Sequence, residues 1–103
     1  MGAPEARIEN YLRRRVREEG GLIRKVRWIG RRGAADNIVK WEFPRFAYVE
    51  CKAEGEEVDW DSLQGREITR LRSLGYLVYV VNSKPAVDAM IAEVKGGIKW
   101  HTR

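Results

Sequence analysis

Apolar residues recur along this chain with two spacings, which together predict three helices and four strands. Ile8, Leu12 and Val16 follow one another every four positions, so they share one face of a helix. Short runs in which apolar and polar residues alternate predict strands. The expected order is a helix over 4–19, strands over 22–29, 37–41 and 46–49, a helix over 59–74, a strand over 76–81 and a helix over 83–95.

The run 76–81 is apolar at every position, which predicts a central strand with both faces covered. Helices that alternate with strands favour an α/β fold in which helices flank a mixed sheet. At 103 residues, the chain is expected to form one domain over 1–103 with a small core. Four aromatic residues are expected to pack in the core or at its edge rather than to stack on bases: Trp41, Phe43, Phe46 and Tyr48.

A turn at 43–45 separates the second and third predicted strands, which indicates a hairpin. The start of its first strand then lies beside the end of its second, so Asp36 is expected next to Glu50 and Lys52. Because side chains alternate along a strand, Glu50 and Lys52 point to one side and Cys51 to the other. Two carboxylates and an ammonium group therefore meet at one end of the hairpin.

Paired carboxylates repel each other unless a hard divalent cation lies between them. Mg²⁺ and Mn²⁺ take oxygen ligands, commonly one or two carboxylates with water and phosphate. The expected ligands are Asp36, Glu50 and the backbone carbonyl of Cys51. A water bound to such a cation is a stronger nucleophile at neutral pH, and Lys52 can orient it or neutralise charge on a phosphate. No small-molecule cofactor is expected.

A basic loop directly precedes Asp36, and the whole chain carries a formal net charge of +5 with a pI near 9.7. This balance suits a polyanionic partner such as DNA. Arg31 and Arg32 can form bidentate contacts with phosphate, and glycines such as Gly33 let the backbone approach closely. These residues are expected to hold the DNA backbone rather than to read bases.

Three further basic residues are candidates for contact with DNA phosphates. Arg14 and Arg17 share one side of the first helix, where phosphate contact and simple solvation are equally expected. Lys25 lies on the first strand, and solvation is the preferred interpretation there.

The composition also limits where the protein acts. A single cysteine excludes an internal disulfide and fits a reducing compartment. The chain has no apolar stretch near the roughly 20 residues of a membrane span, and its beginning lacks the apolar segment of a signal peptide. A cytoplasmic protein without a membrane partner is expected.

Three motifs occur in order: G-R-R-G-x-x-D at 30–36, E-x-K at 50–52, and a helix with an early glutamine at Leu63-Gln64. Together they resemble the virus-type replication-repair nuclease domain, VRR-NUC, a branch of the PD-(D/E)XK nucleases. The resemblance covers most of the chain, to about Val81. Two positions depart from the family pattern: Ala35 stands where proline is common, and Cys51 stands where an aliphatic residue is usual.

The resemblance implies the αβββαβ core of that superfamily, with Asp36, Glu50, Lys52 and Gln64 as the catalytic set. It also implies a metal-reaching glutamate on the first helix, either Glu5 or Glu9, which the spacing does not decide. The competing interpretation of Gln64 is a capping box with Asp61.

The same resemblance implies a stand-alone phage protein that acts in a bacterial host cell. It implies a homodimeric, metal-dependent endonuclease that recognises branched DNA, in particular a Holliday-junction resolvase. Three alternatives stay open: a nuclease for flaps, nicked duplex or single strands; a non-catalytic basic DNA-binding module; and a subunit of a larger assembly that supplies the catalytic site elsewhere.

Overall fold

The computed structural model describes residues 4–27 and 35–96. Its elements are α1 (Ala6–Glu18), β1 (Leu22–Lys25), β2 (Asn37–Lys40), β3 (Phe46–Cys51), α2 (Leu63–Ser73), β4 (Val78–Val81) and α3 (Lys84–Gly96). The predicted order and type of every element are confirmed. The largest differences in extent are at α2, which begins four residues later than expected, and at β1, which ends at Lys25.

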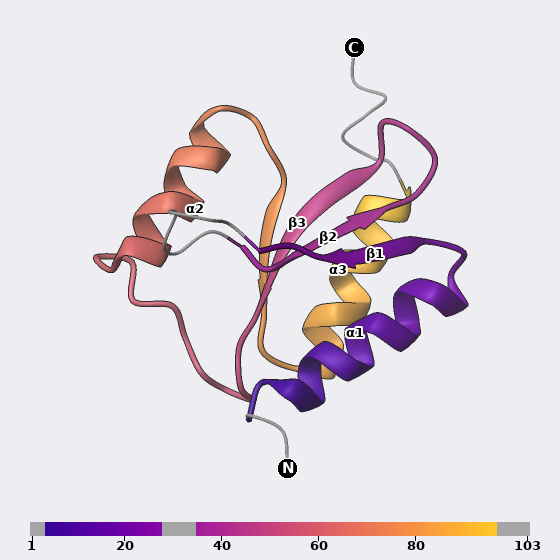
Figure 1. The fold of residues 1–103 in the computed structure, drawn as a ribbon, viewed down its shortest axis with the longest axis horizontal. Coiled ribbons are helices and arrows are strands. Elements are labelled where there is room, and N and C mark those ends of the chain that lie inside the picture. The colour runs from indigo at the N-terminus through magenta and orange to yellow at the C-terminus, as the bar shows by residue number, and fades with distance from the viewer. Residues whose placement is uncertain (1–3, 28–34, 97–103) are drawn as a thin grey trace.

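The four strands form one mixed sheet in the order β1-β2-β3-β4 (Figure 1). β1 and β2 pair antiparallel, β2 and β3 pair antiparallel, and β3 and β4 pair parallel. The expectation of a central strand at 76–81 is wrong, because β4 has only β3 beside it within the described sheet. Its continuous apolar run has another cause: Val78 packs toward α2, whereas Val81 packs in the core beneath α1 and α3. Both faces of β4 are therefore covered although it is an edge strand.

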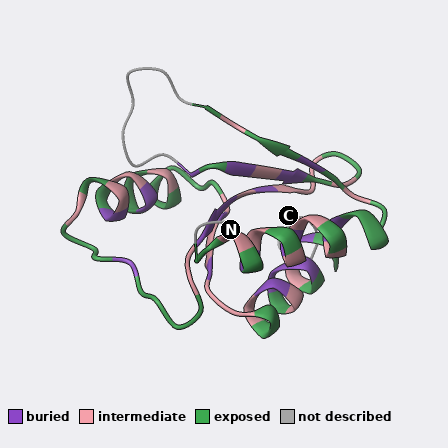
Figure 2. Ribbon diagram, turned by 60° about the horizontal axis from the view of Figure 1, so that its bottom comes forward, coloured by how far each residue is buried: buried purple, intermediate pink, exposed green. Residues whose placement is uncertain are grey.

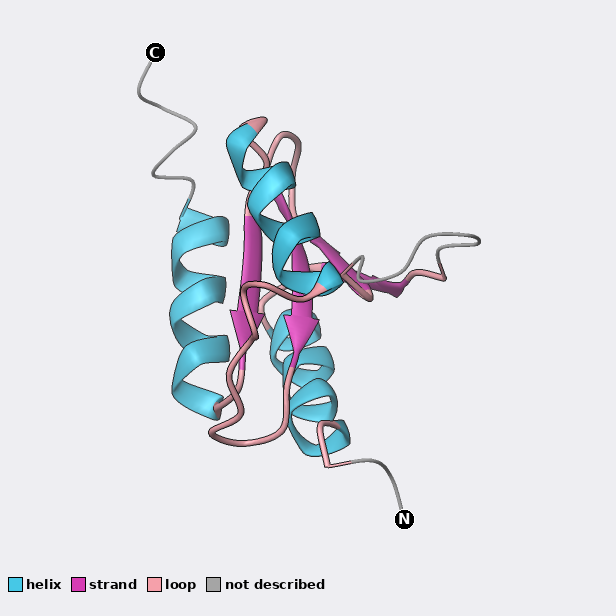
Figure 3. Ribbon diagram, turned by 90° about the vertical axis from the view of Figure 1, so that its left-hand side faces the viewer, coloured by secondary structure: helices cyan, strands magenta, loops and turns pink. Residues whose placement is uncertain are grey.

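Helices lie on both faces of the sheet (Figures 1 and 3). α1 and α3 pack together under one face, where Leu12, Val39 and Val87 are completely buried. α2 packs on the other face against β4, with Ile68 and Val78 in a smaller cluster. β1 is the most exposed strand (Figure 2), with only Ile23 buried. The expected α/β fold with flanking helices is confirmed.

Polar contacts between α1 and α3 fix the helices that carry part of the site. Asp88 of α3 accepts hydrogen bonds from Tyr11 Oη at 2.9 Å and from Arg15 Nε at 3.1 Å. The Arg15 guanidinium also contacts Glu18 and Glu19. Arg15 therefore joins the two helices and is not an open phosphate contact. No helix in the described part of the chain is long and apolar enough to cross a bilayer.

The start of α2 depends on a close backbone approach at Gly65. Ser62 caps the helix, since its Oγ accepts a hydrogen bond from the Gly65 N–H at 3.1 Å. Gly65 is buried against the preceding turn, and a Cβ at this position would lie 2.5 Å from Asp59 O and 2.5 Å from Trp60 Cα.

We expect Gly65→Ala to destabilise the fold, although alanine usually favours a helix. The new methyl group meets backbone that cannot rotate away, and overpacking of this kind costs about 1–3 kcal/mol. The matched control is Gly96→Ala at the end of α3, where a Cβ meets nothing within 4 Å. Urea denaturation of both variants measures the difference. A Gly65→Ala protein as stable as the wild type would contradict the close approach.

Candidate active site

The β2–β3 pairing brings together the two carboxylates that the sequence singled out. Asn37 is opposite Val49 in the antiparallel register, so Asp36 lies across from Glu50. Both residues line a cavity of about 180 Å³ at the end of the sheet nearest the start of α1. The remaining lining residues are Glu5, Ala6, Glu9, Lys25 and Cys51. The predicted convergence of Asp36 and Glu50 is confirmed as geometry.

Glu50 is the most perturbed carboxyl group of this site. Glu50 is the residue before last in β3, and it is only 7 % exposed. Burial, followed by the negative charge of Asp36, raises the pKa of Glu50 to about 7. A hydrogen bond from Gln64, the charge of Lys52 and a hydrogen bond from the Asp36 backbone oppose that rise. Glu50 Oε1 is buried and has no hydrogen-bond partner among the described residues.

The charge of Lys52 and a hydrogen bond from Gln64 therefore both favour the ionised form of Glu50. Tyr48 packs toward α2, whereas Val49 and Cys51 pack in the core beneath α1 and α3. The alternation predicted for β3, with Cys51 opposite to its neighbours, is confirmed. The capping box proposed for Gln64 and Asp61 is wrong, because the N-cap is Ser62. This leaves the Gln64 side chain available to reach the carboxylate.

A second polar cluster surrounds Glu9 on α1. Glu9 Oε2 accepts a hydrogen bond from Lys25 Nζ at 2.8 Å and another from Asn37 Nδ2 at 3.0 Å. Burial alone would raise the pKa of Glu9, but these two hydrogen bonds and nearby positive charges outweigh it and hold the pKa below its usual range. Lys25 is exposed to solvent, as preferred from sequence, and it is also an ion-pair partner of Glu9.

Asn37 is a site residue that the sequence analysis missed. It is completely buried and joins β2 to α1 through Glu9. Asn37 lies two residues before the buried Val39 on β2, so both side chains point to the same side of the strand. A polar residue at such an inward position could have indicated a site residue from the sequence. Asn37 Oδ1 is buried and has no hydrogen-bond partner among the described residues.

The structure also separates Glu5 from Glu9, which the sequence left equivalent. Glu5 occupies the N-cap position of α1, is exposed and makes no side-chain cap hydrogen bond. Glu9 lies one turn further along, mostly buried, with its carboxylate held against β1 and β2. Both line the cavity, but only Glu9 is fixed in place by described neighbours.

Cys51 contributes no thiolate to the site. Its side chain is 7 % exposed within the main core, and burial, with the negative charges of Glu9 and Glu50, raises its pKa to about 12. The thiol is therefore protonated at neutral pH and is a poor metal ligand. This fits the expectation that only the Cys51 backbone carbonyl would contribute.

The donor set suits a hard cation that is bound partly by the substrate. Among residues 4–27 and 35–96, no group of three or more His, Cys, Asp or Glu side chains could by itself enclose a metal ion. Mg²⁺ and Mn²⁺ do not require one, since one or two carboxylates with water and phosphate suffice. The Asp36–Glu50 pair, with Glu50 Oε1 buried and unpartnered within the described structure, meets that need.

The structure places only some of the residues expected to contact DNA. Arg31, Arg32 and Gly33 lie outside the described residues. Arg14 and Arg17 are exposed on α1, and Arg14 Nε lies 3.7 Å from Glu18. The charge of this side of α1 is therefore partly neutralised.

Comparisons with known proteins agree on one family. The chain is 40% identical over 80 residues to "Putative nuclease p44" of Acyrthosiphon pisum secondary endosymbiont phage 1. The aligned region covers 78% of this chain and 84% of that protein. It is also similar to a solved VRR_NUC domain, with 35% identity and a TM-score of 0.80, over 89% of this chain and 98% of the other. No family model matches the chain.

Proposed function

Because this chain belongs to the VRR_NUC family of nucleases, we propose that it is a metal-dependent, structure-specific DNA endonuclease of the Holliday-junction resolvase type. The observation that carries the proposal is Glu50, a buried carboxylate beside Asp36 and Lys52 with one oxygen that no described residue satisfies. A fold rarely retains such a group without a use, because buried polar atoms are normally hydrogen-bonded.

In this proposal, Asp36 and Glu50 hold Mg²⁺ or Mn²⁺ together with the Cys51 backbone carbonyl, and Glu9 is the helix carboxylate on the same cavity. The bound cation supplies a more acidic water and neutralises phosphate charge. Asn37 positions Glu9 through the 3.0 Å hydrogen bond. The chain would thereby present negative charge to the cation from the residue before β2, from β3 and from α1.

Lys52 and Gln64 are assigned to the reacting phosphate. Both lie close enough to Glu50 to lower its pKa, so both face the place where a phosphate would meet the cation. The Lys52 ammonium group orients the attacking water or stabilises charge on the phosphate. Gln64 donates to the water or to a phosphate oxygen. Hydrolysis forms a bond between the water oxygen and phosphorus and breaks the bond from phosphorus to the leaving sugar oxygen. The water gives a proton to solvent, and the leaving oxygen takes one up from solvent.

The substrate is proposed to be branched DNA held through its backbone. A chain of 103 residues has little surface for reading sequence, and Arg31, Arg32, Gly33, Arg14 and Arg17 supply sequence-independent phosphate contacts. A homodimer would place two sites about a two-fold axis and nick a junction symmetrically. Phage DNA in the cytoplasm of a bacterial host is the proposed setting.

The test is cleavage of labelled four-way junction, fork, duplex and single-stranded DNA in EDTA, Mg²⁺ or Mn²⁺. We expect cutting only with a metal, confined to the branched substrates, and lost in Lys52→Ala, which also controls for contaminating nuclease. Cutting of all substrates would retain the nuclease and reject the structural specificity. Tight junction binding without cutting in either metal would favour a DNA-binding module instead.

A further inference from the structure

The face of the sheet opposite α1 and α3 is only partly covered. In the registers of β1, β2 and β3, Leu22, Lys40 and Phe46 form one row across this face, and Arg24, Ile38 and Tyr48 form the next. α2 packs against β4 and reaches only Tyr48 of these residues. The rest is uncovered by any described helix. We define the open sheet face by Arg24, Ile38, Lys40, Phe46, Tyr48 and the turn residue Phe43.

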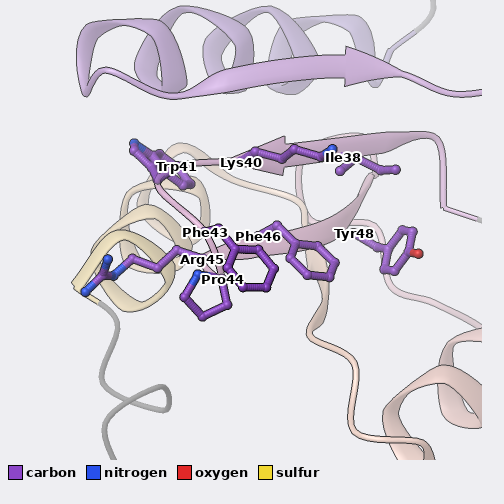
Figure 4. Close-up of a pocket in the computed structure, with 8 residues that line it drawn as sticks. All are labelled: Ile38, Lys40, Trp41, Phe43, Pro44, Arg45, Phe46 and Tyr48. Carbon is purple, nitrogen blue, oxygen red and sulfur yellow. The ribbon is translucent and has the colours of Figure 1, made fainter.

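Aromatic rings dominate this open sheet face. Phe43 is 86 % exposed, which contradicts its expected place in the core or at its edge. The rings of Phe46 and Tyr48 meet edge to face at 6.3 Å, and Tyr48 meets Tyr76 in the same way at 6.1 Å. Figure 4 shows Phe43, Phe46 and Tyr48 on one side of the hairpin, around a cavity of about 400 Å³.

Trp41, another aromatic residue of the same hairpin, is packed closely against its neighbours. Its ring turns the other way, toward α1 (Figure 4), and its Nε1–H donates to Glu19 O at 3.1 Å. A Cβ on Gly21 would come within 2.6 Å of that ring, so Trp41 fills its site tightly. Trp41 alone among the hairpin aromatics packs against the core beneath α1 and α3, whereas Tyr48 packs toward α2.

The charges of the open sheet face favour a polyanion over a second copy of the chain. Lys40 and Arg45 line the cavity, and its described lining contains no carboxylate. Arg24 lies in the neighbouring row and is exposed. Two copies related by a two-fold axis would bring these cations toward one another, which is unfavourable. Flat apolar rings beside cations match the bases and phosphates of a nucleic-acid strand.

The same face of β3 continues past Tyr48, where α2 begins to cover it, to Glu50 of the candidate active site. Phe46, Tyr48 and Glu50 alternate along β3 and project to one side, and each two-residue step advances roughly 6.6 Å along the strand. Bases in a duplex are stacked on each other, so only an unpaired strand can lay its bases on these rings. We propose that the open sheet face binds an unpaired strand of the DNA substrate and guides it to the phosphate at Glu50. This inference rests on the proposed nuclease function and specifies its substrate class as DNA with an unpaired strand beside the cut.

The experiment separates binding from cleavage. Binding is measured by fluorescence anisotropy in EDTA on a Lys52→Ala background, with a labelled oligothymidylate of about 12 nucleotides and a blunt duplex of equal length. Phe43→Ala and Phe46→Ala remove one ring each. Phe46→Tyr retains the ring, and Leu74→Ala removes an exposed apolar side chain at the C-cap of α2.

We expect Phe43→Ala and Phe46→Ala each to weaken oligothymidylate binding by roughly 5- to 150-fold, the equivalent of about 1–3 kcal/mol per stacked base. Binding of the duplex changes little, and Phe46→Tyr and Leu74→Ala bind as the parent does. Phe43→Ala retains the fold because that ring is 86 % exposed, so its result stands even if Phe46→Ala is destabilised.

Three outcomes would overturn the inference. Unchanged oligothymidylate binding in both alanine variants means that the rings hold no bases. Equal weakening for single strand and duplex means a general electrostatic surface. Sedimentation showing that Phe43→Ala separates a dimer, with oligothymidylate binding intact, means that the face joins two copies. Ring-dependent binding by a protein that cuts nothing in Mg²⁺ or Mn²⁺ would support this inference while rejecting the nuclease.

Discussion

Glu50→Gln is expected to reduce DNA cleavage at least about 100-fold, since even residues behind metal ligands cost 10–100-fold when changed. Glutamine keeps the size of the side chain and its ability to accept a hydrogen bond. It removes the negative charge from a group that is 7 % exposed and whose Oε1 has no partner among the described residues. Cleavage of labelled junction DNA in Mg²⁺ and in Mn²⁺, compared as kcat/KM, measures the effect.

The matched control is Glu54→Gln, the same change of charge at an exposed position of the loop after β3. It should cut as the wild type does. Comparable cutting by Glu50→Gln would show that the Glu50 charge has no part in the reaction, and the proposed cation site would then be wrong. Circular dichroism of both variants verifies that the fold is intact.

The second large effect of Glu50→Gln is on the free energy of unfolding. The substitution is expected to raise stability although it lowers activity. The pKa of Glu50 is about 7 in the folded protein against an ordinary value of 4.5, so the folded state binds a proton more tightly than the unfolded state. Between these values the unfolded state loses its proton first, and the wild type becomes less stable as the pH rises. A difference of 2.5 pKa units corresponds to a loss of about 3 kcal/mol by pH 8.

Glutamine cannot ionise, so Glu50→Gln does not suffer this loss. We expect the stability of the variant relative to the wild type to increase by about 3 kcal/mol between pH 4 and pH 8. Urea denaturation in EDTA across this range gives the free energy of unfolding of each protein. Glu9, whose lowered pKa makes stability fall as the pH drops, is present in both proteins and cancels in the comparison. A pH-independent difference between the two would contradict the desolvation of Glu50.

The two results together identify what kind of residue Glu50 is. If a buried carboxylate supports the fold, a mutation that neutralises it lowers the free energy of unfolding. If instead the charged form of the residue lowers stability and cleavage requires the residue, then the residue is retained for its chemistry. Added Mg²⁺ should then stabilise the wild type more than Glu50→Gln, because a ligand that binds only the folded state raises its stability.

The sequence by itself determined the order of the elements and the core of the site. Helical and strand spacings are local properties, so α1, the β2–β3 hairpin and α3 follow from short windows of residues. The convergence of Asp36 with Glu50 is also local, because a tight hairpin places its two ends side by side. Alternation along β3 then fixed Cys51 on the core side.

Only the tertiary structure decided how distant segments meet. An apolar run indicates that both faces of β4 are covered, but it does not indicate how many strands flank β4. The prediction of a central strand is therefore wrong. Glu5 and Glu9 have the same chemistry, and only the packing of α1 against β1 and β2 brings Glu9 to Lys25 and Asn37.

The same limit explains Gln64 and Phe43. α2 has Ser62 as its N-cap, and Gly65 packs closely against the preceding turn. Because Ser62 caps the helix, the Gln64 side chain is available to reach Glu50. Phe43 lies in the turn between β2 and β3, where it is 86 % exposed. Spacing along the chain gives the side of an element on which a residue lies, whereas the partner on that side is set by packing between segments that are far apart in sequence.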